Sequence, residues 1–204
     1  MNEIESRAWH WEHIGWSVDI LPFFTEIAHR IPQGGTYVEV GVFLGRSLSY
    51  MGTIRPDLHL VAIDPWADGT SQGYDGVGEH VGAITAMGGL YAAFLMQMRR
   101  HAPEVLPRTK LIREFSHVGL AKLEPASVDM VFIDGAHDEA SVRADILAAE
   151  RVLKPGGILS GHDYCGNNGV MAALDKTAVT LAYWADTQYP GWLPGKSTCW
   201  WMQK

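Results

Sequence analysis

The chain has 204 residues, 47% of them hydrophobic and 19% charged, which suits a globular domain with one substantial core. Its 16 Lys and Arg against 23 Asp and Glu give a net charge of −7 without any basic run, so a nucleic-acid substrate is not expected. No apolar run approaches the ~20 residues that cross a bilayer, and the first residues do not resemble a secretory signal.

Helices and strands are expected to alternate along the chain. The first 35 residues have apolar side chains at helical spacing and are expected to form a helical cover in one or two pieces. Seven strands are expected, over residues 36–42, 58–63, 109–115, 128–133, 157–163, 177–184 and 197–204. Helices are expected over residues 46–54, 79–101, 117–123, 139–153 and 169–176, with a loop over 65–78 and a turn over 154–157.

This alternation predicts an α/β fold with a mostly parallel sheet, because parallel strands need helical crossovers between them. We expect residues 1–204 to form a single domain, with residues 1–35 as the helical cover and residues 36–204 as the core. Ligands of such sheets bind outside the carboxyl ends of the strands. The polar residues that follow the strands are therefore the candidates for a functional site.

A glycine-containing turn follows the first expected strand, with the sequence EVGVFLG from Glu39 to Gly45. Glycines suit such a turn because the backbone must approach a ligand closely. The dinucleotide fingerprint G-x-G-x-x-G is absent, which argues against NAD. The pattern E-x-G-x-x-x-G instead resembles the first motif of class I S-adenosylmethionine-dependent methyltransferases. That resemblance implies a cofactor site with Glu39, Gly41 and Gly45, the acid lying near the methionine portion.

Other residues after the strands are candidates for the same cofactor. Asp64 ends the second strand, where a carboxylate can accept both ribose hydroxyl hydrogens. Trp66 follows it and is assigned to the cofactor pocket. Ser47 either caps the next helix or contacts the cofactor carboxylate. Ser116 follows the third strand, where the family often contacts the adenine side, and Asp134 completes the predicted cofactor set.

The segment from Val128 to Tyr164 carries FIDG-x-H at the fourth strand and GG-x-x-x-x-HDY at the fifth. It resembles a small methyltransferase family related to metal-dependent O-methyltransferases of sugars and other small hydroxylated molecules. The resemblance implies a Rossmann-like, doubly wound fold, with a seven-stranded sheet that is mostly parallel and has an antiparallel last strand.

The same resemblance implies a divalent metal between the residues that follow these two strands, at Asp134, His162 and Asp163. The carboxylates suit Mg²⁺, whereas the imidazole that replaces an acid in the relatives suits Mn²⁺ or another transition metal better. His162 is thus either a ligand or a group that orients Asp163. His137 occupies the place of a general base in some relatives; its alternatives are to cap the following helix or to bind a backbone carbonyl.

The sequence therefore predicts an S-adenosylmethionine-dependent O-methyltransferase that is assisted by a metal and acts on a small-molecule acceptor. A metal-independent or N-directed methyltransferase that uses His137 alone is the alternative of the same fold. An NAD-dependent oxidoreductase and a non-catalytic nucleotide-binding module are more remote, because of the glycine spacing and the acids after the strands. Asp138 and Asp145 are expected to be charges on the exposed face of the 139–153 helix.

The two cysteines, Cys165 and Cys199, form no C-x-x-C pair, which favours a reducing, cytoplasmic location. We expect no membrane contact. The sequence leaves open whether the chain forms a homo-oligomer.

Overall fold

A computed structural model describes residues 20–67, 84, 86–164, 169–175, 182–183 and 199–204. The strands are β1 (Thr36–Val40), β2 (His59–Ile63), β3 (Thr109–Ile112), β4 (Val128–Ile133), β5 (Leu153–Gly161), β6 (Ala182–Tyr183) and β7 (Trp200–Gln203). The helices are α2 (Ile20–Ile27), η1 (Ala28–Arg30), α3 (Arg46–Ile54), α5 (Leu90–His101), η2 (Leu106–Arg108), α6 (Ser116–Ala121), α7 (Glu139–Val152) and α8 (Gly169–Asp175).

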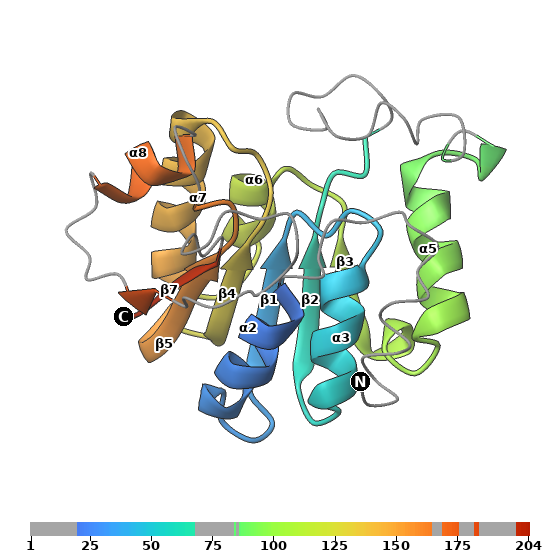
Figure 1. The fold of residues 1–204 in the computed structure, drawn as a ribbon, viewed down its shortest axis with the longest axis horizontal. Coiled ribbons are helices and arrows are strands. Elements are labelled where there is room, and N and C mark those ends of the chain that lie inside the picture. Colours follow the sequence, from blue (N-terminus) through green and yellow to red (C-terminus); the bar gives the residue numbers. More distant parts are fainter. Residues whose placement is uncertain (1–19, 68–83, 85, 165–168, 176–181, 184–198) are drawn as a thin grey trace.

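These strands form one sheet in the order β3-β2-β1-β4-β5-β7-β6 (Figure 1). Strands β1 to β5 pair in parallel, and β7 is antiparallel to both β5 and β6. The predicted Rossmann-like sheet with an antiparallel last strand is confirmed. The strand order reverses between β1 and β4, so the ligand crevice of such a sheet lies at the carboxyl ends of these two strands.

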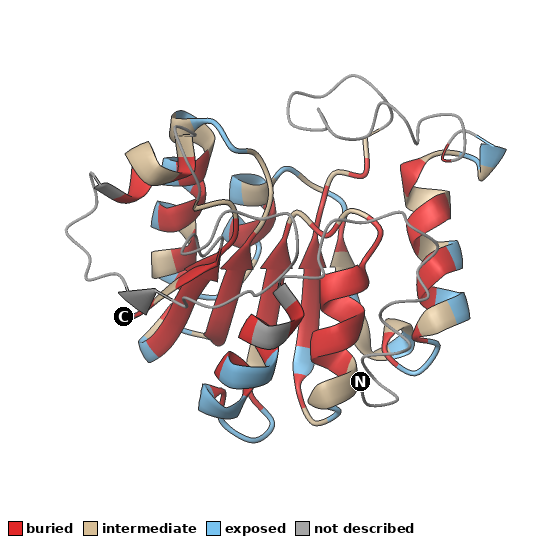
Figure 2. Ribbon diagram, in the orientation of Figure 1, coloured by how far each residue is buried: buried red, intermediate tan, exposed pale blue. Residues whose placement is uncertain are grey.

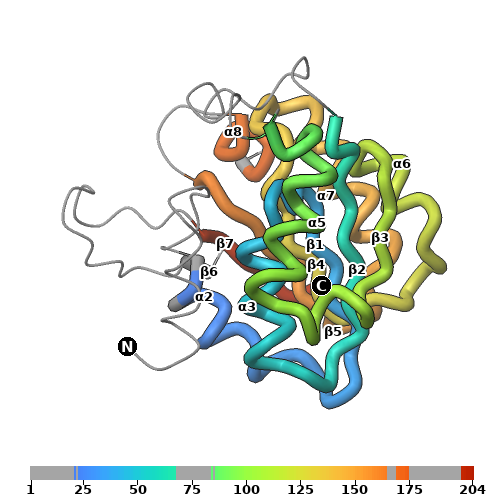
Figure 3. The backbone as a smooth tube through the Cα atoms, turned by 90° about the vertical axis from the view of Figure 1, so that its right-hand side faces the viewer, coloured from blue at the N-terminus to red at the C-terminus, as the bar shows by residue number. Residues whose placement is uncertain are grey.

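Helices cover both faces of the sheet, which explains why the parallel strands are nearly continuous apolar runs (Figure 2). One apolar core joins the sheet to α2, α3 and α5, and includes the edge-on pair Phe24–Phe132 at 4.8 Å. A second core joins it to α6, α7 and α8 around Val131 and Ile146. Figure 3 shows α2 and α3 on one side of the strands and α6 on the other.

Two predicted elements differ from the structure at glycines. The helix expected over 79–101 is interrupted before α5 begins at Leu90, because Gly88 and Gly89 adopt φ values of +91° and +97°. Residues 84 and 86, ahead of this break, are helical, and residues 79–83 and 85 lie outside the described part of the chain. The turn expected over 154–157 lies within β5, where the pairing with β4 shifts register between Val128 and Met130. Gly156, with φ +78°, permits that irregularity.

The N-terminal cover is described from Ile20 onward, where α2 packs against α3 and the hydroxyls of Thr25 and Tyr50 are 2.7 Å apart. Residues 1–19 and 68–83, which include the rest of the cover and most of the expected loop, lie outside the described residues. Among the described helices, none combines the length and the apolar composition that a bilayer crossing requires.

Candidate functional site

The turn after β1 contains two glycines that the fold requires for packing. A Cβ on Gly41 (φ +80°) would lie 2.1 Å from the carbonyl oxygen of Asp134, so this glycine lets β1 and β4 end against each other. A Cβ on Gly45 (φ +84°) would lie 2.7 Å from Met98 Sδ and 2.8 Å from Phe94 Cε2 on α5. Both predicted glycines thus lie at the switch point of the sheet; their contact with the cofactor stays a prediction.

Glu39 is fully buried beneath this turn. Its carboxylate accepts hydrogen bonds from the Tyr37 and Ser47 hydroxyls, each at 2.7 Å. Burial raises the pKa of Glu39 to about 8, although these two hydrogen bonds act to lower it. The carboxylate therefore ties the first turn of α3 to β1, and its role near the cofactor stays a prediction.

Ser47 was the candidate cap of the helix that follows the turn. That interpretation is wrong, because α3 begins at Arg46 and its N-cap residue is Gly45. Ser47 lies inside the first turn, where its hydroxyl reaches back to Glu39. The alternative contact, with the cofactor carboxylate, stays a prediction.

Asp64 connects the ends of β1 and β2. Its carboxylate is 2% exposed and accepts the backbone N–H groups of Phe43 at 2.8 Å and Trp66 at 2.6 Å. Both donors have positive φ, +51° and +42°, so the acid stabilises backbone conformations that are otherwise costly. Carboxylate oxygens can each accept a second hydrogen bond, which leaves the ribose contact as a prediction.

Trp66 packs inside the fold, 1% exposed. Its ring lies against Phe94 (4.6 Å between centroids) and Tyr91 (5.3 Å), and its indole N–H donates to the carbonyl of Phe43 at 2.8 Å. The indole thereby fixes the turn after β1 to the segment after β2. Trp66 therefore has a structural role in this part of the fold. The predicted contact of Trp66 with the cofactor stays a prediction.

Ser116, the candidate on the adenine side, begins α6 and donates its hydroxyl to Asp145 on α7. Asp145 is 1% exposed, so its interpretation as a surface charge is wrong. Burial raises the pKa of Asp145 to about 6, while the hydrogen bond from Ser116 lowers it. The cause is visible in the sequence, because Asp145 lies on the same helical stripe as the buried Val142 and Ile146.

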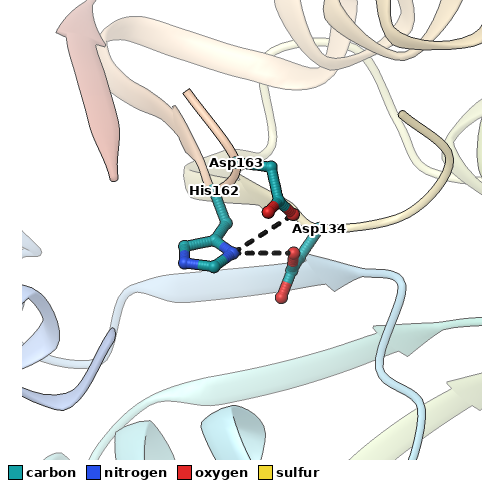
Figure 4. A group of neighbouring side chains, drawn as sticks. All are labelled: Asp134, His162 and Asp163. Atoms are coloured by element: carbon teal, nitrogen blue, oxygen red, sulfur yellow. Dashed lines mark ion pairs between the residues drawn. The ribbon is translucent and has the colours of Figure 1, made fainter. Parts of the chain in front are cut away.

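The carboxyl ends of β4 and β5 bring Asp134, His162 and Asp163 together, as predicted (Figure 4). His162 Nδ1 lies 3.5 Å from Asp134 Oδ1 and 3.2 Å from Asp163 Oδ2. One donor atom from each residue fits within 4.8 Å. Neighbouring ligands of an ion bound at ~2.1 Å are ~3.0 Å apart in octahedral and ~3.4 Å apart in tetrahedral geometry. The donor set therefore fits a divalent metal in spacing and in chemistry.

His137 joins this group from the segment after β4. Its Nε2 lies 2.8 Å from Asp163 Oδ2, and its side chain is 45% exposed. The hydrogen bond to Asp163 raises the pKa of His137 above its ordinary value, against the effect of burial. Burial alone would raise the pKa of Asp163, but hydrogen bonds from His137 and His162 hold it well below its usual range. The alternative of a helix cap is wrong, because Asp138 caps α7 through the Ser141 N–H at 3.0 Å.

Two residues of this region escaped the sequence analysis. Tyr37 supports Glu39, and the signal was its position two residues earlier on the same face of a strand. Trp200 lines a small hollow together with Asp134, His137 and His162. Trp200 and Trp201 alternate along the last strand, a pattern that places one of them in the core but does not indicate this hollow.

Residues 38–164, well over half of the chain, match the family described as a methyltransferase domain. The matched range includes the turn after β1 and the acid and histidine residues that follow β4 and β5. No relative among curated proteins matches the chain.

Several solved structures share the fold. An S-adenosylmethionine-dependent O-methyltransferase from Thermotoga maritima has a TM-score of 0.64 at 12% identity, over 100% of this chain and 71% of its own. A TDP-rhamnose 3′-O-methyltransferase of calicheamicin biosynthesis has a TM-score of 0.56 at 16% identity, over 90% and 77%. A tRNA methyltransferase from Aquifex aeolicus has a TM-score of 0.63 at 9% identity, over 99% and 76%.

At these identities the structures share a fold with the chain, and their different acceptors say nothing about its own. The family match, together with a methyltransferase-like turn at the switch point of a sheet in the order 3-2-1-4-5-7-6, identifies the general activity. The chain belongs to the methyltransferase domain family and is an S-adenosylmethionine-dependent methyltransferase.

Proposed function

We propose that this enzyme is an O-methyltransferase assisted by a divalent metal, Mg²⁺ or Mn²⁺, and that its acceptor is a hydroxyl of a small sugar-like or natural-product molecule. The observation that carries the proposal is the cluster of Asp134, His162 and Asp163 after β4 and β5. A mixed set of carboxylate and imidazole ligands favours Mn²⁺ over Mg²⁺. The acidic net charge of −7 supports a small-molecule acceptor over a nucleic acid.

A divalent ion held by these three residues would lower the pKa of the acceptor hydroxyl and hold it in place. The remaining chemistry falls to His137. Its Nε2 is engaged with Asp163 at 2.8 Å, which leaves Nδ1 to accept the proton of the hydroxyl. The acceptor oxygen then forms a bond to the methyl carbon as the bond from that carbon to sulfur breaks. The products are the methyl ether, S-adenosylhomocysteine and a proton on His137.

The turn after β1 and the end of β4 support the alignment of the two reactants. Asp134 lies directly against Gly41, so a group bound by Asp134 is close to the turn assigned to the cofactor. Since the sulfonium methyl is already activated, alignment supplies much of the rate.

A metal-independent enzyme is the second candidate, favoured by the hydrogen bond between His137 and Asp163. That pair resembles a carboxylate that orients a general base, an arrangement that serves without an ion. The two candidates differ in whether Asp134 and His162 take part in the reaction.

The test is methyl transfer from labelled S-adenosylmethionine to a panel of sugars, sugar nucleotides, catechols and the matching amines. Each reaction runs with chelator, and then with Mn²⁺ or Mg²⁺ restored. We expect turnover on a hydroxyl that chelator abolishes and Mn²⁺ restores, and that Asp163→Ala removes. Glu124→Gln, an exposed acid at the opposite end of β4, is the control and should keep full turnover. Turnover that chelator does not change would contradict the metal-assisted mechanism and favour the metal-independent enzyme. Turnover on amines alone would exclude O-methylation.

A further inference from the structure

The strand β7 lies beside the carboxyl end of β5, directly before His162 and Asp163. Trp200 is the register partner of Gly161 and is completely buried. A Cβ on Gly161 would lie 2.4 Å from Trp200 Cζ2, so the indole occupies the space that a side chain at position 161 would need. The ring therefore packs closely against the backbone that leads into the predicted metal ligands.

The indole N–H of Trp200 donates to the carbonyl oxygen of His162 at 3.1 Å. This carbonyl belongs to the peptide unit that links His162 to Asp163. The orientation of that unit depends on ψ of His162 and φ of Asp163. Asp163 has a φ of +60°, in the left-handed region that residues with a Cβ seldom adopt. Trp200 thus fixes the peptide unit whose orientation sets the directions of the His162 and Asp163 side chains relative to each other.

The backbone of His162 is held on its other side as well. Its N–H donates to the carbonyl of Ile133 at the end of β4, at 3.0 Å. The residue is therefore fixed between β4 on one side and β7 on the other. Without the indole donor, the buried carbonyl would lose this partner, and the unfavourable φ of Asp163 would lose one of its supports.

We infer that Trp200 is a positioning residue, whose indole N–H sets the angle at which His162 and Asp163 direct their donor atoms toward Asp134 and His137. The ring lines the same hollow as Asp134, His137 and His162. The inference rests on the proposed function in one respect only, namely that a divalent ion uses these donors. Groups that orient metal ligands without touching the metal commonly change its affinity by about 10–100-fold when they are altered.

The test compares Trp200→Phe, which keeps an aromatic ring and loses the N–H, with Trp201→Phe on the same strand. Trp201 faces the opposite side of the sheet, where its ring lies 4.7 Å from the guanidinium of Arg30. We expect Trp200→Phe to weaken Mn²⁺ binding about 10–100-fold, measured by paramagnetic resonance, with S-adenosylhomocysteine affinity changed less than about twofold. Trp201→Phe should leave both affinities near wild type.

A second measurement does not depend on the metal. In metal-free protein, ¹⁵N chemical shifts of the imidazoles of His162 and His137 report their hydrogen bonds with Asp163. Trp200→Phe should move these signals and Trp201→Phe should not. If wild-type protein binds no Mn²⁺ but the signals move only in Trp200→Phe, the proposed function fails and the inference stands. If these signals do not move in folded Trp200→Phe protein, the inference is wrong, whatever Mn²⁺ affinity is measured.

Discussion

At the amino end of the sheet, Asp57 and Asp129 pair with Arg and Lys, whereas at the carboxyl ends of β1, β2, β4 and β5 the acidic side chains accept hydrogen bonds from hydroxyl, backbone and imidazole groups. Asp57 pairs with Arg55 at 2.7 Å, and Asp129 with Lys154 at 2.8 Å. At the other end, Glu39 binds hydroxyls and Asp64 binds backbone N–H groups.

This difference separates acids that lie far from the predicted site from acids that lie beside it. A guanidinium or ammonium neutralises its carboxylate, and Arg55 accordingly holds the pKa of Asp57 well below its ordinary value. Hydroxyl and backbone donors stabilise a carboxylate without cancelling its charge. Of the acids at the carboxyl end, Asp163 keeps its negative charge because hydrogen bonds from His137 and His162 hold its pKa well below the usual range, whereas burial raises the pKa of Glu39 to about 8. The charge on Asp163 favours a cationic ligand such as a divalent ion.

The largest expected effect is on turnover and comes from removing the imidazole of His137, at the carboxyl end of the sheet. His137→Ala should lower kcat by about 10²–10⁴-fold, because it removes the proposed proton acceptor. S-adenosylhomocysteine affinity and the melting temperature should stay near those of the wild type. Steady-state kinetics and calorimetry on one preparation measure all three. A fall in cofactor affinity that matched the fall in kcat would mean that His137 serves binding instead.

Two glycine substitutions compare how tightly the backbone is packed at the carboxyl end and at the amino end of the sheet. Gly41→Ala should reduce the free energy of unfolding by about 3 kcal/mol or more, since its Cβ would collide with the Asp134 carbonyl. Gly34→Ala, at the amino end, has a φ of +68° but no heavy atom within 4 Å of its Cβ. It should cost only about 1–2 kcal/mol for the left-handed conformation. Urea denaturation measures both, and equal losses would show that packing at Gly41 relaxes freely.

The buried acid on α7 should make stability depend on pH. Asp145 has a pKa of about 6 in the folded protein against an ordinary value of 3.8, so the folded state holds its proton more tightly. The contribution of protonated Asp145 to the free energy of unfolding is complete below about pH 4 and is lost as the pH rises through about 6. The free energy of unfolding of Asp145→Asn should therefore rise relative to that of the wild type by about 2–3 kcal/mol as the pH increases from 4 to 7. Urea midpoints at several pH values measure this gain, and a constant difference would contradict it.

The smallest effect is expected from an ion pair at the amino end. The side chain of Lys154 is 43% exposed, and Asp129 keeps the Thr36 N–H as a second donor at 2.8 Å. Lys154→Met should therefore cost less than about 1 kcal/mol of unfolding free energy. Methyl transfer should be unchanged. A loss of turnover without a loss of stability would break the separation between the two ends of the sheet.

Much of the fold could be predicted because the central strands are apolar runs that end at glycine or at an acid. The rule that ligands bind at strand ends also predicted that Asp134, His137 and Asp163 come together. The break in the 79–101 helix was not predicted, because helical periodicity of apolar residues continues through Gly88 and Gly89 while the helical backbone conformation does not. Periodicity records which faces are buried, and it is insensitive to a local change in φ.

The internal partners of the acids could not be predicted in the same way. That Asp64 binds the Phe43 and Trp66 N–H groups depends on two residues with positive φ, neither of which is a glycine. The contact of Trp200 with His162 depends on the register of β7 against β5. The contacts of Asp64 with Phe43 and of Trp200 with His162 follow from long-range pairing, for which one sequence contains no local signal, whereas the contact of Asp64 with Trp66 is local, across two residues.

The parallel pairing of β1 with β4 has a kinetic consequence. The Thr36 N–H reaches Asp129 across 93 residues, and Trp200 reaches His162 across 38. Pairings this distant close late in folding, because the entropy of the intervening chain is lost before the contacts form. The binding crevice is thus a late product of refolding, so added S-adenosylhomocysteine should slow unfolding and leave the refolding rate nearly unchanged.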